Sequence, residues 1–283
     1  MYGALATGWN IIGGFSGYPS FGNVVFFGLG AYSAGIMMSH FGWLLLPAAV
    51  VGIVISAALA AFMWPILRLK GHYFAIATLA VAEAARELIA ISSFTGGGTG
   101  LGLPIFVGGI DSMARYFYFI MFALLVIGIV VTVFIRRSRM GYALIAIKVD
   151  ERTAESLGID TARYKTMAFV ISAILTSAVG SVYAYWITFI DPVSVFAVTI
   201  SVQMIMMALL GGVGTVFGPV AGALILGLIS EWAWINFPTI HTAALGIVMV
   251  LLILFLPQGL ADVLRKRGNV VEILRSQMRS YGI

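Results

Sequence analysis

Long apolar segments recur through almost the whole chain, and they restrict its fold more than any other feature. About nine can be counted, at residues 2–14, 21–39, 43–67, 72–92, 116–135, 166–188, 197–211, 216–236 and 242–257. A helix of about 20 apolar residues crosses the hydrocarbon core of a bilayer. A transmembrane β-strand would instead alternate apolar and polar side chains, and these runs do not. The sequence therefore predicts an all-α, polytopic bundle in a membrane, with eight to ten segments.

Composition supports a membrane protein and excludes several other classes. The chain is 61% apolar with a mean hydropathy of +1.06, whereas soluble domains are about 45–50% apolar. It has no cysteine, which excludes disulfides, thiol catalysis and cysteine metal sites. Its three histidines are widely spaced and do not resemble a metal site. The net charge of +5 comes from basic residues in loops and the C-terminal tail, so it indicates topology and not nucleic-acid binding.

The longest polar interruption runs from Arg136 to Lys165. It holds seven basic and four acidic residues in a chain that is only 10% charged. By the positive-inside rule this stretch lies in the cytoplasm. Alternate threading puts the basic loops at 68–70 and 265–267 on the same side, and the N-terminus, 93–115 and 189–196 on the other. We therefore expect a transmembrane domain over residues 1–262, with a cytoplasmic loop at 136–165, and a basic cytoplasmic tail over 263–283.

The central loop has a helical pattern. Leu144 and Ile147, and then Ala154 and Leu157, would share one face of two short amphipathic helices along the membrane surface, with charged residues toward water. Asp150 is a predicted N-cap and Gly158 a predicted helix end. A solvated loop without a partner is the alternative, and spacing alone does not decide between the two.

Glycine is abundant, at 33 residues, and forms small faces that let membrane helices approach closely. Two Gly-rich interrupted stretches, Gly13–Ala31 and Gly211–Ala223, resemble each other. Segments interrupted by Gly or Pro in corresponding halves are typical of transporter pathways. Segments 2–14 and 197–211 are also short for full crossings, which predicts broken or re-entrant helices. Packing, pathway lining and chance similarity all remain open.

Charged and phosphate-binding patterns are few. The glycines of Thr95–Gly100 are not a phosphate loop, because no Lys-Ser/Thr follows them. Any ATP and Mg²⁺ would therefore be bound by partner subunits, and no cofactor is expected here. Within segment 72–92, Arg86 is positioned to pair with Glu83 and Glu87. A water-lined pathway or a contact with a second membrane subunit is the functional alternative for these charges.

Five passages, in order along the chain, resemble the membrane subunits of high-affinity branched-chain amino-acid importers of the ATP-binding-cassette (ABC) type, specifically the M-type permease. They are Gly17–Tyr32, Leu67–Glu83, Thr95–Leu101, Met140–Phe169 and Leu210–Ala223. The resemblance extends over nearly the whole chain, and these five passages follow the family's order. One departure is Pro19, where the family commonly has Gln, and the N-terminus is shorter than usual.

This resemblance implies a permease that translocates branched-chain (hydrophobic) amino acids into the cytoplasm and is not itself an enzyme. It implies a second, dissimilar permease, two cytoplasmic ATPases and an extracytoplasmic substrate-binding protein, in a bacterial-type plasma (inner) membrane. In such importers a short cytoplasmic helix of the permease docks in a cleft of the ATPase. The resemblance places the coupling contact at Gly141, Ala143, Leu144, Ala146, Ile147, Asp150, Glu151, Ala154, Glu155 and Gly158.

Polar and small residues of the resembling passages are candidates for the pathway or the subunit interface. They are Ser20, Phe21, Gly22, Asn23, Gly28, Gly30, Tyr32, Tyr73, Thr78, Glu83, Gly211, Gly212, Gly214 and Gly218. Urea and short-chain amide importers share this permease type and are the alternative substrate classes. An ion-coupled transporter would need ionisable groups at the midplane, where Glu83 is the one candidate. A membrane-embedded enzyme has no matching constellation.

Overall fold

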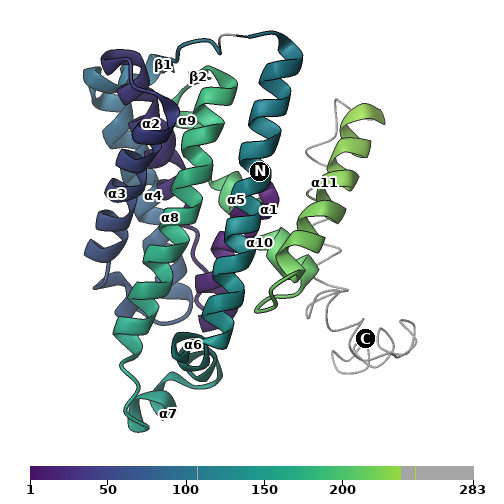
Figure 1. The fold of residues 1–283 in the computed structure, drawn as a ribbon. Helices are drawn as coiled ribbons and strands as arrows, with labels where there is room; N and C mark the ends of the chain where they lie inside the picture. The colour runs from purple at the N-terminus through teal and green to yellow at the C-terminus, as the bar shows by residue number, and fades with distance from the viewer. Residues whose placement is uncertain (107, 237–245, 247–283) are drawn as a thin grey trace.

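The computed structural model describes residues 1–106, 108–236 and 246, and its helices form an elongated bundle (Figure 1). The helices of this part are α1 (Tyr2–Trp9), α2 (Asn23–Phe41), α3 (Leu45–Phe62), α4 (His72–Ile91), α5 (Ile110–Arg137), α6 (Arg139–Val149), α7 (Glu151–Ser156), α8 (Thr161–Ile187), α9 (Pro192–Val195), α10 (Val198–Gly211) and α11 (Gly218–Asn236). A π-helix, η1 (Asn10–Gly14), continues α1, and three short 3₁₀ turns are η2 (Ile66–Arg68), η3 (Ser93–Thr95) and η4 (Gly97–Thr99).

Helix α8 is the centre of the bundle and packs against α1, α2, α3 and α5. Small residues make its contact with α2 close. A Cβ atom added to Gly30 would lie 2.1 Å from the carbonyl oxygen of Ser177, and one added to Gly180 would lie 2.1 Å from that of Phe27. Both distances are far below van der Waals contact, so only glycine permits this backbone approach. At Gly30 and Gly180, glycine therefore serves the close packing of α2 against α8.

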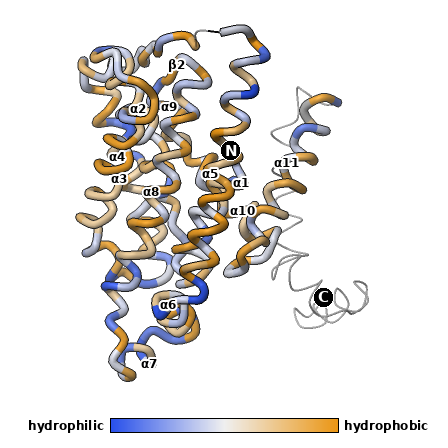
Figure 2. The backbone as a smooth tube through the Cα atoms, in the orientation of Figure 1, coloured by the Kyte–Doolittle hydropathy of each residue, from blue (hydrophilic) through white to orange (hydrophobic). Residues whose placement is uncertain are grey.

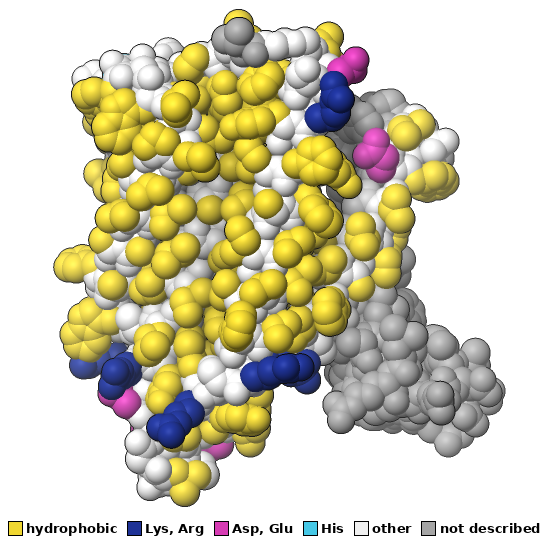
Figure 3. All heavy atoms as spheres, viewed as in Figure 1, with side chains coloured by type: hydrophobic (Ala, Val, Ile, Leu, Met, Phe, Trp, Pro, Cys, Tyr) yellow, Lys and Arg dark blue, Asp and Glu magenta, His cyan; other side chains and the backbone are white. Residues whose placement is uncertain are grey.

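The outer surface is apolar over most of its height, and Lys and Arg side chains gather near one end (Figure 3). Large apolar side chains stay exposed along several helices, including Leu46 at 75%, Phe134 at 71% and Leu88 at 71%. A surface of this extent is typical of contact with lipid or another membrane subunit. Figure 2 shows the hydrophilic residues concentrated around α6 and α7.

The predicted fold class is confirmed, because the described part is helical apart from two-residue strands. In the described part, fewer helices have the length and apolar composition of a membrane crossing than the eight to ten segments that the sequence predicts. Five helical units of the described part are long and apolar enough to cross a membrane: α2, α3, α5, α8 and α9–α10 together. Helix α4 has the length but carries Glu83, Arg86 and Glu87, and α1 is short. The predicted segment 242–257 and the tail 263–283 lie outside the described residues.

Two connections meet at the end opposite α6 and α7 (Figure 1). Strands β1 (Leu101–Gly102) and β2 (Phe189–Ile190) pair antiparallel, with Leu101 opposite Ile190. The 93–115 and 189–196 connections therefore lie on one side of the bundle, as alternate threading predicted. The η2 loop lies at the other end, where Lys70 is 3.8 Å from Glu151 of α7.

Candidate functional site at the α6–α7 end

The central polar stretch folds into two short helices joined at a sharp corner. Ser138 accepts a hydrogen bond from the Gly141 amide at the start of α6. Asp150 caps α7 by accepting a hydrogen bond of 2.6 Å from the Thr153 amide. After α7, Gly158 adopts a positive φ of +83° and donates to the Glu155 carbonyl. The predicted N-cap and helix end are confirmed, since both satisfy backbone groups that a helix terminus leaves unpaired.

One face of these helices is buried in the hydrophobic core of the chain. Leu144, Ile147 and Ala154 are 0%, 3% and 1% exposed and pack in a cluster that includes Leu67 and Phe169. The prediction that Leu157 shares this face is wrong, because Leu157 is 75% exposed. Helix α7 ends at Ser156, so the helical spacing that would align Leu157 with Ala154 stops one residue too early.

The outward face carries large apolar side chains that the sequence analysis did not select. Tyr142 is 69% exposed, Ile145 41% and Val149 83%. With Leu157 they give an otherwise charged segment four exposed apolar side chains. Exposed apolar groups at a polar end are typical of a surface that binds a protein or the membrane.

The predicted coupling residues divide between the two faces of α6 and α7. Gly141, Ala143, Leu144, Ile147 and Ala154 are buried within the chain itself. The others reach the surface in part or in full, and they are Ala146, Asp150, Glu151, Glu155 and Gly158. A partner could contact the second group directly, apart from Glu151, whose side chain is 11% exposed and pairs with Lys165; the first group holds the helices on the bundle.

A groove of about 690 Å³ runs beside α6. Arg136 and Arg137 from the end of α5 line it together with Tyr142 and Ile145. Phe217, from the turn between α10 and α11, is part of the lining and is 67% exposed. The groove thus combines two cations with apolar floor residues, and it extends the outward face of α6 toward α11.

A buried lysine ties α7 to the membrane helices. Lys165 of α8 is 1% exposed, and its ammonium lies 2.6 Å from Glu151 of α7 and 2.6 Å from the Leu67 carbonyl of η2. It also donates to the Tyr18 hydroxyl at 3.2 Å and lies 4.4 Å above the Tyr18 ring. The Tyr18 hydroxyl in turn donates to Glu151. We call Lys165, Glu151, Tyr18, Leu67 and Lys70 the Lys165 cluster.

The electrostatics of the Lys165 cluster favour its charged form. Burial alone would raise the pKa of the Glu151 carboxyl, but hydrogen bonds from Lys165 and Tyr18 outweigh it and hold that pKa below its ordinary value. Burial, followed by the hydrogen bond to Glu151, raises the pKa of the Tyr18 hydroxyl. The hydroxyl therefore stays a donor, and the carboxylate stays ionised, over the neutral range.

The two Gly-rich interrupted stretches meet in space. The side-chain amide of Asn10 in η1 donates to the Thr215 carbonyl and accepts from the Gly214 amide, both at 2.8 Å. Lys148 of α6 donates to the Gly14 carbonyl at 2.9 Å. We call Asn10, Gly14, Lys148, Gly214 and Thr215 the Gly14–Gly214 junction. Burial lowers the pKa of the Lys148 ammonium at this contact.

Several pathway candidates gather at the start of α2, next to α4 and α10. The Phe21 amide donates to the Thr78 hydroxyl, and the Phe21 carbonyl accepts from Ser201. Ser20 and Asn23 are fully buried, and Asn23 donates to Ser172 of α8 at 2.7 Å. Gly22 packs against Thr78, where an added Cβ would lie 3.0 Å away. This constellation is a buried polar patch in an apolar bundle.

The remaining candidates lie elsewhere. Gly28 packs against the ring of Phe196, and Tyr32 stacks on the same ring at 6.0 Å. On α4, Tyr73 is 74% exposed. Glu83 pairs with Arg86 at 2.9 Å, and Arg86 also contacts Glu87 at 3.0 Å, so the predicted internal pairing is confirmed. Gly211, Gly212 and Gly218 form the turn between α10 and α11, beside the Gly14–Gly214 junction.

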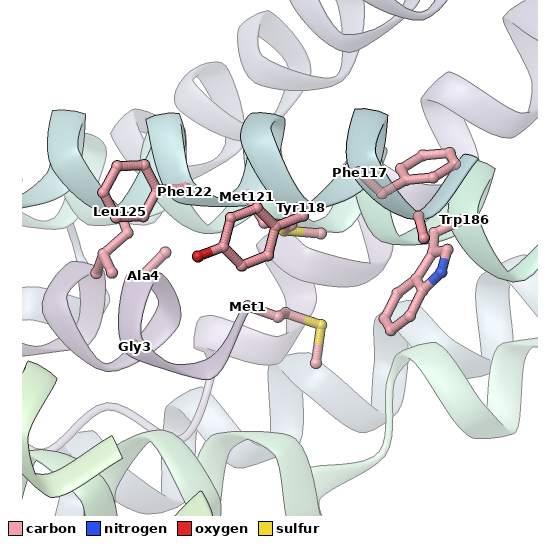
Figure 4. Close-up of a pocket in the computed structure, with 10 residues that line it drawn as sticks. Met1, Gly3, Ala4, Phe117, Tyr118, Met121, Phe122, Leu125 and Trp186 are labelled. Atoms are coloured by element: carbon pink, nitrogen blue, oxygen red, sulfur yellow. The ribbon is translucent and has the colours of Figure 1, made fainter. Parts of the chain in front are cut away.

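An apolar pocket of about 440 Å³ lies between α1, α5 and α8 (Figure 4). The rings of Phe117, Tyr118 and Trp186 form one wall, and Met1 and Ala4 face them. Its lining carries no charged side chain. An amino acid holds two charges, and each is costly to desolvate without a partner, so this pocket suits an apolar group and not a zwitterion.

Comparison with known families decides the class of the protein. A family model described as a branched-chain amino acid transport system permease component matches residues 1–256. The chain belongs to this permease family. It is 30% identical to the high-affinity branched-chain amino acid transport system permease protein LivM of Salmonella typhimurium, over 94% of this chain and 68% of that protein. The LivM of Escherichia coli K12 gives the same figures.

The permease is also similar to LivH of Escherichia coli K12, another high-affinity branched-chain amino acid transport system permease protein. The identity is 27%, over 92% of this chain and 90% of LivH. No solved structure matches the chain. The family membership and the five apolar helical units together make the protein a multi-pass membrane permease and not an enzyme.

The sequence analysis of the permease missed several residues that the structure brings to its polar contacts. They are Asn10, Tyr18, Lys148 and Lys165. One signal was present for Asn10, because a lone amide inside an apolar segment needs an internal partner. Lys165 gave no such signal, since it stands among other charges at the edge of the loop.

Proposed function

We propose that this permease is a membrane subunit of an ABC importer that carries branched-chain (hydrophobic) amino acids into the cytoplasm. ATP and Mg²⁺ bind in separate ATPase chains, whose movement drives the permease between two states. The names of the relatives support the substrate class. The α6–α7 segment, with its outward apolar face and its buried attachment, supports the coupling role.

The observation that carries the proposal is the two-sided character of α6 and α7. Tyr142 and Val149 present apolar surface outward, at 69% and 83% exposure. On the inner side, Glu151 is bonded to the buried ammonium of Lys165 at 2.6 Å. A push on the outer face is therefore transmitted to α8, the central helix of the bundle. A solvated loop would need neither the exposed apolar groups nor the buried ion pair.

The proposed importer has three kinds of partner. Similarity to both LivM and LivH supports pairing with a second, dissimilar permease. One of the two ATPases docks on the α6–α7 end, which then lies in the cytoplasm, and an extracytoplasmic binding protein delivers substrate to the opposite end. The complex resides in a plasma (inner) membrane. The groove lined by Arg136 and Arg137 extends the docking surface and favours acidic residues on the ATPase.

A pair of valine substitutions tests the docking surface. Val149→Glu puts a charge on the outward face of α6, and Val193→Glu puts the same charge on α9 at the opposite end, where Val193 is 68% exposed. We expect Val149→Glu to lower co-purification of the ATPases and ATP-driven uptake by at least about tenfold, the effect of one lost hot-spot contact. Val193→Glu should retain the ATPases. Equal co-purification of both variants would contradict the docking surface.

Uptake by the reconstituted complex tests the substrate class. Competition with leucine, isoleucine and valine is expected to inhibit uptake of a labelled branched-chain amino acid, and urea or short-chain amides are not. Inhibition by urea or amides alone would assign the alternative substrate class. Uptake by the permease without ATPases, driven by an ion gradient, would replace the import mechanism by secondary transport.

A further inference from the structure

The contact between the two broken stretches uses an asparagine that is entirely enclosed. Asn10 is 0% exposed, and both halves of its side-chain amide bond the backbone of the α10–α11 turn. These bonds connect residues more than 200 positions apart in the chain. Because an unpaired buried amide is costly, the bonds favour a closed contact between η1 and the turn.

Two glycines make the contact possible. A Cβ atom added to Gly14 would lie 1.9 Å from Asn10 Oδ1 and 2.8 Å from the Gly214 nitrogen. Gly214 has a φ of +80°, and a Cβ there would approach the Gly14 carbonyl to 3.0 Å. The two stretches therefore touch backbone to backbone. Side chains larger than glycine would hold them apart.

Helix α6 reaches this contact directly. The Lys148 ammonium bonds the Gly14 carbonyl at 2.9 Å, and it would lie 3.4 Å from a Cβ on Gly214. The stem of Lys148 also packs on Gly17, just beyond η1. A displacement of α6 away from η1 would thus remove Lys148 from the Gly14 carbonyl.

Behind the contact lie buried polar atoms that have no hydrogen-bond partner among the described residues. They are Ser20 Oγ, Asn23 Oδ1 and Thr176 Oγ1. The α1–η1 segment covers them, since Trp9 donates to the Ser20 carbonyl at 2.8 Å and Gly8 packs on Thr176. Unpaired buried polar atoms are rare in proteins, and they indicate a place that water or a polar solute enters in another state.

We infer that the Gly14–Gly214 junction is the closed gate at the α6 end of the translocation pathway, with Asn10 and Lys148 as its positioning residues. The inference rests on the proposed import function. When α6 moves with its ATPase, Lys148 leaves the Gly14 carbonyl, η1 separates from the α10–α11 turn, and the buried polar atoms open to the α6 side. Freed backbone groups then line the opening, where irregular backbone is tolerated at membrane depth.

A single-thiol experiment tests the gate in the full chain. The protein has no cysteine, so Ser20→Cys introduces its only thiol, at a fully buried side chain whose hydroxyl has no partner in the described part. Sealed vesicles of both orientations are treated with a small, water-soluble thiol reagent. Val149→Cys and Val193→Cys, both exposed, mark the α6 side and the opposite side.

Four changes are then combined with Ser20→Cys. Asn10→Ala removes both amide bonds, Lys148→Met removes the bond to Gly14, and Lys148→Arg keeps a donor. Arg139→Met is the matched control, because Arg139 is an exposed cation of α6 without a partner in the described part. We expect slow labelling in the parent and about tenfold faster labelling in Asn10→Ala and Lys148→Met, the effect of losing one or two net hydrogen bonds. Lys148→Arg and Arg139→Met should stay near the parent rate.

The side of reaction decides the position of the gate. Faster labelling must occur in the vesicles in which Val149→Cys reacts. Fast labelling of the parent, unchanged rates in Lys148→Met, or labelling from the Val193 side would each overturn the inference. Because Lys148→Met changes a surface side chain, its result holds even if Asn10→Ala does not fold. The assay needs no ATPase and no substrate, so it can fail while ATP-driven uptake succeeds, and the reverse.

Discussion

The Lys165 cluster and the Gly14–Gly214 junction lie beneath the same two short helices, but they are built from different interactions. The Lys165 cluster is an ion pair: a buried ammonium 2.6 Å from a carboxylate, completed by a phenol and a carbonyl. The Gly14–Gly214 junction holds backbone to backbone through one neutral amide and one lysine.

The difference in chemistry predicts a difference in strength. Breaking a buried ion pair by removing one partner costs about 3–5 kcal/mol, whereas each Asn10 hydrogen bond contributes about 0.5–1.5 kcal/mol and the charged hydrogen bond from Lys148 about 1.5–3 kcal/mol. When a partner displaces α6 and α7 together, the individually weaker hydrogen bonds of the Gly14–Gly214 junction therefore break before the ion pair of the Lys165 cluster. One short segment can therefore be firmly attached to the bundle through α7, at the Lys165 cluster, and make a contact that separates more easily through α6, at the Gly14–Gly214 junction.

The largest expected effect comes from removing the buried cation. Lys165→Met should lower the free energy of unfolding by about 3 kcal/mol, at the low end for a buried pair because Glu151 keeps 11% exposure. Lys70→Met is the matched control, since its ammonium is 3.8 Å from Glu151 and its side chain 55% exposed, and it should cost less than about 0.5 kcal/mol. Thermal unfolding of the purified permease measures both. If both variants lost the same free energy of unfolding, the buried Lys165 pair would be no stronger than the exposed Lys70 contact.

A smaller effect is expected from overpacking the Gly14–Gly214 junction. Gly14→Ala places a methyl group against Asn10 and Gly214, and we expect a loss of about 1–2 kcal/mol, typical of overpacking. Gly227→Ala is the matched control, because an added Cβ there meets no atom of the described residues within 4 Å. Thermal unfolding and thiol accessibility at position 20 measure the change. If Gly14→Ala were as stable as Gly227→Ala, the close approach of the two breaks would be wrong.

The smallest expected effect is a pH dependence of the stability that the Lys165 cluster contributes. The pKa of Glu151 is lowered in the folded protein, so its ionised form contributes stability above the ordinary glutamate value of about 4.3. That contribution disappears as the pH falls through the lowered pKa. The difference in melting temperature between the parent and Glu151→Gln should therefore be largest at neutral pH and shrink below about pH 4. A constant difference across this range would show that the pair is not ionic.

The amino-acid sequence alone determined the fold class and the two ends of α7. Apolar length requires helices in a bilayer, because backbone groups there have no water to bond. Asp150 and Gly158 gave the bounds of α7 because capping is a contact between near neighbours in the chain. The resemblance of two glycine-rich stretches also appeared in the sequence, without a reason why both should be broken.

Tertiary structure decided which polar residues meet and which face of α6 is free. Lys165 and Tyr18 are 147 positions apart, and Asn10 and Thr215 are 205 apart. Helical periodicity describes only neighbours within a few residues, so it could not pair them. Periodicity placed Leu144 and Ile147 on one face of α6, but it could not tell that this face packs against Leu67 and Phe169, because those residues are distant in the chain. Membrane helices pack where small residues permit close approach, and that fit exists only between whole helices.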